Sequence, residues 1–137
     1  MRVVQPEGWP RPRGYANGVL AQGRLLFTAG QIGWDENEQF ASDDLIEQVR
    51  QALKNTLAVL AAGGAKPEHV VRMTWYLTDK REYLRRAKEF GAVYRELMGR
   101  HFPAMAMVQV AALIEDRAKV EVETTAVIPD KSSDGLA

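Results

Sequence analysis

The residues best suited to take part in a reaction lie between Phe102 and Ile128, a stretch whose alternating side chains predict two successive strands. Along the first strand, Met105 and Met107 point to the same face, because successive side chains alternate across a pleat. Along the second strand, Glu121 lies on the face opposite to the β-branched residues beside it. If the two strands are neighbours in a sheet, Glu121 and the two methionines meet, and we expect them to line one pocket.

Glu121 is the candidate catalytic residue of this pocket. A carboxylate can position or activate an attacking water molecule, and it can carry protons between the reacting atoms. The alternative interpretation is a solvated strand residue that pairs with Lys119 or Arg117. For Met105 and Met107 the alternative to a ligand surface is ordinary core or interface packing, because methionine fills irregular gaps.

A second group of candidates precedes the first predicted helix. The backbone N–H groups of Gly30 and Gln31 can hold a carbonyl or carboxylate oxygen, since glycine allows a ligand to approach the backbone closely. Tyr15 can donate a hydrogen bond, and Trp34 can form a wall of a ligand site. The alternatives remain open, because Gly30 can simply turn the chain and Trp34 can be a packing residue.

Composition excludes several classes of function. The chain has 137 residues with 18 Lys and Arg against 18 Asp and Glu, so it offers no basic field for nucleic acid or for an acidic membrane surface. It has no cysteine, which excludes disulfides and thiol nucleophiles and is compatible with a reducing cytoplasm. His69 and His101 lack the spacing of a zinc site, and we expect neither a metal nor another cofactor. We therefore expect a cytoplasmic protein with a small-molecule ligand.

The length predicts one domain over residues 1–137, without an internal linker. The first 14 residues contain three prolines, which favour an extended arm, and no apolar run typical of a signal peptide or membrane span. Regular structure is expected to begin near Tyr15, and residues 130–137 are expected to form a disordered tail.

The remaining segments provide the elements that must position these candidates. Residues 18–21 and 25–29 flank Gln22 and Gly23 and predict a hairpin, with Asn17-Gly18 as a competing turn, and residues 30–42 predict a loop. A helix is expected from Asp44, which has a capping residue three positions later, to Gly63-Gly64. Residues 70–78 predict a central strand, and a second helix follows from Asp79 to Gly99.

This order of elements predicts an α+β architecture with two helices on one face of a mixed sheet. We expect the small alanine side chains of the strand after Pro103 to pack under the helices, which leaves an apolar opposite face uncovered. The residues assigned to that face are Met105, Met107 and Leu113, with some of Trp75, Tyr76 and Leu26. Self-association would cover them, so a homo-oligomer with clefts between its subunits is expected.

Five segments, read in order, resemble one known family. They are Tyr15–Gly18, Ala29–Ile32, Trp75–Asp79, Phe102–Ala104 and Val120–Glu123. Together they are similar to the RidA (YjgF/YER057c/UK114) family, formerly described as L-PSP endoribonuclease, over nearly the whole chain. The resemblance implies a chorismate-mutase-like α+β fold, a homotrimer, and ligand clefts at the three subunit interfaces.

The resemblance also implies a reaction and a departure from it. Active members hydrolyse enamine or imine intermediates to a keto acid and ammonia, and an arginine directly after the Pro-Ala pair holds the substrate carboxylate. That position is Met105 here, and hydrogen bonds to charged groups are each worth about 1.5–3 kcal/mol, so we expect weak or no activity on 2-aminoacrylate. Arg13 in the arm is the alternative cation.

Other positions divide between agreement with the family and departure from it. Tyr15, Tyr94 and Glu121 match the family pattern, whereas Ala29 replaces a common serine, Met107 a frequent cysteine and Gly91 a frequent asparagine. The sequence therefore leaves two hypotheses. One is a deaminase-like hydrolase for an enamine or imine that depends less on the arginine. The alternative is a non-catalytic binding protein for an apolar or carbonyl-bearing metabolite.

Overall fold

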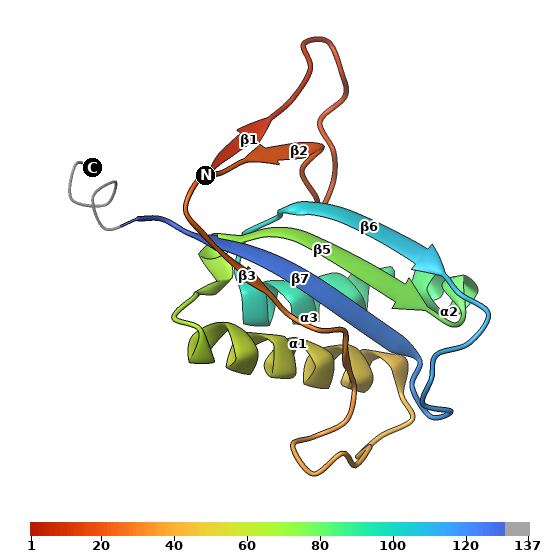
Figure 1. Ribbon diagram of the computed structural model, residues 1–137. Helices are drawn as coiled ribbons and strands as arrows, with labels where there is room; N and C mark the ends of the chain where they lie inside the picture. Colours follow the sequence, from red (N-terminus) through yellow and green to blue (C-terminus); the bar gives the residue numbers. More distant parts are fainter. Residues whose placement is uncertain (131–137) are drawn as a thin grey trace.

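The sheet is organised around its longest strand, β7 (Val120–Ile128), in the computed structural model, which describes residues 1–130 (Figure 1). On one side β7 pairs antiparallel with β3 (Arg24–Phe27) and β4 (Gln31–Ile32). On its other side lies β5 (Val70–Leu77), which is antiparallel to β7 and parallel to β6 (Ala104–Gln109). The sheet is therefore mixed, as the sequence predicted.

The first helix, α1 (Leu45–Ala62), agrees closely with its prediction. The Asp44 side chain caps it by accepting a hydrogen bond from the Glu47 amide at 3.1 Å, which satisfies an N–H group that has no partner within the helix. At the other end Gly64 adopts a left-handed φ of 83°, which a glycine tolerates. The apolar side of α1 is buried against the sheet, with Val49 and Leu53 fully inaccessible to solvent.

The prediction of a single second helix was wrong, because two helices occupy this part of the chain. They are α2 (Lys80–Arg85) and α3 (Ala87–Met98), and the backbone leaves the helical conformation at Arg86 with φ −116° and ψ 22°. The Arg86 guanidinium pairs with Asp44 at the start of α1 and with Glu89. The break lets α3 lie beside α1 under the sheet while α2 sits at the end of the sheet (Figure 1).

The assignment of the sheet faces was also wrong. Trp75, expected near the uncovered face, is completely buried and packs edge-on against Phe90 of α3, with 4.9 Å between ring centroids. Met105 and Met107 share the helix-covered side and pack against the same core, and so does Leu26. The physical reason is strand register, because Trp75 lies opposite Met107 and directs that methionine to its own face.

The predicted hairpin between residues 18–21 and 25–29 is wrong as well. β2 (Gly18–Leu20) pairs with β1 (Arg2–Val4), whereas β3 pairs with β7. The expected extended arm thus contains a strand, and β1 and β2 stand beyond the sheet on the side away from α1 (Figure 1). β3 forms its backbone hydrogen bonds with β7, which is distant in sequence, instead of with β2 across a local turn.

Three smaller features complete the fold. A short 3-10 helix, η1 (Pro67–His69), leads into β5, and β6 ends at Gln109, so Leu113 lies outside the strand that was expected to contain it. Within residues 1–130, no helix has both the length and the apolar character needed to cross a bilayer. The expected tail, residues 130–137, lies outside the described residues from position 131 onward.

Candidate ligand-binding site

A cavity of about 730 Å³ opens between β6 and the helices α2 and α3. Four of the predicted ligand-binding residues line it, and two core aromatics lie beside them. These six lining residues are Tyr15, Tyr83, Phe90, Tyr94, Met105 and Met107. We call this cavity the methionine pocket. Its volume is in the range of small-molecule sites, which are usually concave and largely apolar.

Local structure explains why the two methionines reach this pocket. They are two residues apart on β6 and therefore point to the same face, and both are partly buried against the core. A thioether supplies dispersion contacts and almost no hydrogen-bonding capacity. The floor of the pocket therefore favours an apolar part of a ligand.

The ring of Tyr94 lines the pocket, whereas its hydroxyl group forms a hydrogen bond within the fold. The hydroxyl donates to the backbone oxygen of His101 at 2.6 Å, and the ring stacks on Phe102 with a centroid distance of 5.6 Å. Burial raises the pKa of Tyr94 well above its ordinary value. Tyr94 is therefore a fixed, neutral wall of the pocket.

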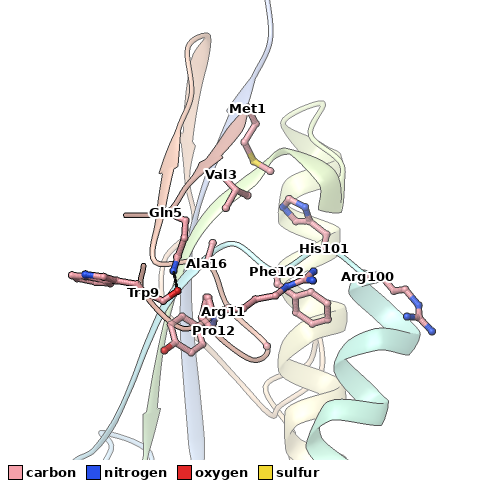
Figure 2. Close-up of a pocket in the computed structure, with 12 residues that line it drawn as sticks. Met1, Val3, Gln5, Trp9, Arg11, Pro12, Ala16, Arg100, His101 and Phe102 are labelled. Carbon is pink, nitrogen blue, oxygen red and sulfur yellow. Dashed lines mark hydrogen bonds between the residues drawn. The ribbon is translucent and has the colours of Figure 1, made fainter. Parts of the chain in front are cut away.

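Tyr15 lies where the methionine pocket meets a second cavity of about 690 Å³, which Figure 2 shows in close-up. The main chain holds this position, because the Ala16 amide donates to the Pro103 oxygen at 2.9 Å. In the second cavity, Arg11 extends from the N-terminal arm toward Phe102, whereas Trp9 points away (Figure 2). Tyr15 and Phe102 line both cavities and form the boundary between them.

Glu121, Gly30 and Gln31 form a different part of the structure. Ile32 of β4 pairs with Glu121 of β7, and this pairing lays the Glu121 carboxylate directly over the α-carbon of Gly30. A β-carbon at residue 30 would overlap that carboxylate, so the absence of a side chain makes the arrangement possible. The neighbouring Gln31 side chain donates to the Ala29 oxygen at 3.2 Å. We call this group the Glu121 site.

The expectation that Glu121 and the methionines meet within one chain was wrong. Trp75 pairs with Met107 on one side and with Val122 on the other, so these three residues share the helix-covered face. Glu121 directly precedes Val122 and therefore points to the opposite face. The two strands are also not neighbours, because β5 lies between them.

Sequence reasoning missed two polar residues beside the Glu121 site. The Tyr76 hydroxyl donates to the Glu123 carboxylate at 2.7 Å, on the face away from the helices. This hydrogen bond, with some burial and the charges of Glu123 and Glu121, raises the pKa of Tyr76 above its ordinary value. The signal was present in the alternation of both strands, because Tyr76 lies opposite Glu121 in the register of β5 and β7.

Trp34 lines neither the methionine pocket nor the second cavity. Its ring lies 5.9 Å from that of Phe40 at an angle of 48°, and its backbone oxygen accepts a hydrogen bond from Asn55 of α1 at 2.7 Å. It therefore anchors the loop before α1. Among residues 1–130, no group of three or more His, Cys, Asp or Glu side chains is placed to hold a metal ion.

Comparison with known proteins places this geometry in a family. The model of the family described as Endoribonuclease L-PSP matches residues 10–128. A 2-iminobutanoate/2-iminopropanoate deaminase from Homo sapiens is 33% identical over 128 residues, which cover 92% of this chain and 89% of the human protein. A RutC family protein of Pyrococcus horikoshii is 33% identical over 125 residues, covering 90% of this chain and 95% of that protein.

Solved structures agree with the sequence relatives. The Rid-family protein YyfB of Yersinia pestis, a protein of unknown function, superimposes with a TM-score of 0.81 at 30% identity, covering 93% of this chain and 98% of that one. Escherichia coli TdcF, solved with bound serine, gives a TM-score of 0.68 at 28% identity, covering 93% and 99%. The chain therefore belongs to the Endoribonuclease L-PSP family, the RidA family that the sequence motifs indicated.

Proposed function

We propose that this protein hydrolyses an enamine or imine intermediate to a carbonyl compound and ammonia. The observation that carries the proposal is the Glu121 carboxylate held over the backbone of Gly30, where we propose that main-chain N–H groups hold the oxygen atoms of the ligand. The names of its relatives support this class of reaction, because proteins over 30% identical to it are named 2-iminobutanoate/2-iminopropanoate deaminases.

The proposal requires that two copies share each site. Within one chain, the methionine pocket and the Glu121 site lie on opposite faces of the sheet, so one small ligand cannot touch both. A second copy that brings its Glu121 site to the mouth of the first copy's methionine pocket would complete the constellation. We propose a homotrimer with three such clefts.

The exposed face of the sheet supports this association. Phe27, Leu25 and Val108 are 68%, 62% and 45% exposed, and they lie on the face away from the helices. Side chains of this size are an apolar surface that a partner can cover. The residues differ from those expected from the sequence, because Met105 and Met107 belong to the other face.

In the proposed reaction, Glu121 accepts a proton from a water molecule as the water oxygen bonds to the imine carbon. The electron pair of the C=N bond moves to nitrogen, which takes up a proton and gives a carbinolamine. Glu121 gives its proton to that nitrogen, then takes the hydroxyl proton and passes it to the amino group, so that the C–N bond breaks, the carbonyl forms and ammonia leaves. The N–H groups near Gly30 hold the oxygen atoms of the substrate during these steps.

Met105 changes the choice of substrate in this scheme. A thioether cannot donate the paired hydrogen bonds that an arginine gives to a carboxylate next to the reacting carbon. We therefore propose weak or no hydrolysis of 2-aminoacrylate and preference for a substrate with an apolar part at this position. A formal net charge of zero also argues for a small molecule instead of nucleic acid.

A second function is favoured by one specific observation. The described residues that line the methionine pocket include no acidic side chain, so the pocket alone provides no group that could activate water. A non-catalytic protein that binds an apolar or carbonyl-bearing metabolite would need only this pocket. The two functions differ in whether Glu121 affects turnover.

The test is ammonia release from a panel of freshly generated imines. If the protein is a hydrolase, Glu121→Gln lowers the rate by about 10²-fold or more, which is typical for the loss of a general base. The matched control is Glu123→Gln, which alters the next outward-facing carboxylate of β7. Turnover no faster than in buffer for every imine would reject the hydrolase and leave the binding function.

A further inference from the structure

Three solvent-exposed cations lie at the mouth of the methionine pocket. Arg13 of the arm and Lys88 and Arg95 of α3 line the pocket together with the apolar floor. None of the three forms an ion pair with a described residue, although α3 and its neighbours contain several paired charges. The pocket therefore combines an apolar base with unneutralised cations at its rim.

Arg95 is placed at this rim by Gly91. The two residues are one helical turn apart, and an Arg95 guanidinium nitrogen lies 3.1 Å from the point where a β-carbon of residue 91 would be. The long arginine side chain thus folds back along α3 over the bare backbone. Glycine in a helix interior costs roughly 0.5–1 kcal/mol relative to alanine, so its presence in α3 calls for a reason, and the space it leaves for the guanidinium provides one.

We propose that Arg95, assisted by Arg13, is an anion anchor that replaces the one lost at Met105. The ligand class that fits is a carboxylate with an extended apolar body, whose hydrocarbon part contacts Met105 and Met107 while its acidic group reaches the rim. A ligand as small as 2-aminoacrylate cannot make both contacts, because its carboxylate is attached directly to the reacting carbon. This inference deepens the proposed function and rests on it for the identity of the site.

Arginine suits this role because its planar guanidinium binds a carboxylate through two parallel hydrogen bonds. The apolar floor excludes water from the rest of the ligand, and its burial adds affinity in proportion to the area removed from water. Lys88 adds positive charge at the mouth of the pocket without the geometry for paired hydrogen bonds. The site should therefore distinguish an acid from a neutral molecule of the same shape.

The experiment measures equilibrium binding of two matched probes, 5-phenylpentanoate and 5-phenylpentanamide, to the full chain by isothermal titration calorimetry. The wild-type protein is expected to bind the acid about tenfold or more tightly than the amide. The loss of a hydrogen bond to a charged group lowers affinity by about this factor. The Arg13→Gln/Arg95→Gln variant should reduce this ratio to about twofold or less. The control Arg81→Gln removes an exposed cation of α2 outside the pocket and should keep the full ratio.

Because no turnover is measured, the result is independent of the imine assay. Preference for the acid that disappears in the double variant supports the anchor even if no imine is hydrolysed. Equal binding of acid and amide, no measurable binding of the acid, or an unchanged ratio in the double variant would each overturn it. The variants alter exposed side chains, and thermal unfolding verifies that they are folded.

Discussion

The carboxylate of Glu121 lies directly over the α-carbon of Gly30, although 91 positions of sequence separate the two residues. The pairing of β4 with β7 produces this contact, and a side chain at residue 30 would occupy the same space. The carboxylate that we propose as the general base and the backbone that we propose to hold the ligand are thus parts of one site. The rate supported by Glu121 should therefore depend on which residue occupies position 30.

Gly30→Ala therefore tests the Glu121 site without touching its charge. The added methyl group must displace the flexible end of Glu121, so we expect ammonia release to fall by about 10²-fold, as for loss of the general base. The free energy of unfolding should be unchanged or higher by up to about 1 kcal/mol, because alanine restricts the unfolded chain. Kinetics and urea denaturation measure the two quantities.

The control for this substitution is the double variant Gly30→Ala/Glu121→Gln. If Gly30 acts through Glu121, the second change adds almost nothing to the loss caused by Glu121→Gln alone. Independent losses that multiply would contradict the contact as the cause of the effect.

Met105→Arg tests the proposal that the methionine pocket lacks a carboxylate anchor at this position. Met105 is partly buried in the methionine pocket, so a guanidinium placed there can meet a small imino acid. We expect hydrolysis of 2-aminoacrylate to rise by about tenfold or more in an ammonia-release assay. Met105→Leu, which has a similar volume and no donor, should give no gain. An equal gain in both variants would mean that the shape of the pocket, and not the arginine, limits the reaction.

Phe27→Glu places a charge on the exposed face of the sheet, where Phe27 is 68% exposed. If this face joins copies of the chain, a charge buried there without a partner is strongly unfavourable. We expect analytical ultracentrifugation to give the wild type a mass three times the 15.3 kDa of one chain. The mass of the variant should shift toward that of one chain. Lys54→Glu, on the helical side of the molecule, is the control. A wild type that sediments as a single chain at assay concentrations would contradict the shared site.

Asp44→Asn tests the charge cluster between α1 and α3. The hydrogen bond from Arg86, together with backbone N–H donors, lowers the pKa of Asp44 below its ordinary value of 3.8. Since the folded pKa is depressed, the ionised Asp44 stabilises the fold above pH 3.8, and this contribution is lost as the pH falls through the folded pKa.

Asparagine caps a helix about as well as aspartate, so the variant should lose the charge and keep the cap. We expect its free energy of unfolding, measured in urea from neutral to acid pH, to fall less with acid than that of the wild type. Arg86→Gln should show the same reduced pH dependence. An acid transition identical in all three proteins would contradict the assigned role of Asp44.

Local signals in the sequence were sufficient for several elements. The caps at Asp44 and Asp79 and the glycines after α1 and α3 mark boundaries that the structure reproduces, because capping depends on residues only a few positions apart. The alternation of β6 correctly placed Met105 and Met107 on one face. Those predictions required only the periodicity of a single element.

Features that depend on strand register could not be predicted in the same way. Alternation shows which residues of one strand share a face with Met107, or with Glu121, but it does not relate the faces of the two strands. The pairing of Trp75 with both Met107 and Val122 decides which face the helices cover. The contact between Gly30 and Glu121 likewise depends on β4 pairing with β7. Long-range pairing of this kind leaves no local pattern in the sequence.

The most direct test of the account mixes two inactive variants. Glu121→Gln destroys the Glu121 site and leaves the methionine pocket intact, whereas Met107→Trp fills the pocket and leaves Glu121 intact. If neighbouring copies supply the two parts, unfolding and refolding an equal mixture creates clefts with both parts intact. In a random mixture about a quarter of the clefts are of this kind, so about a quarter of the wild-type rate of ammonia release should return. A mixture no more active than either variant alone would contradict a site shared between copies.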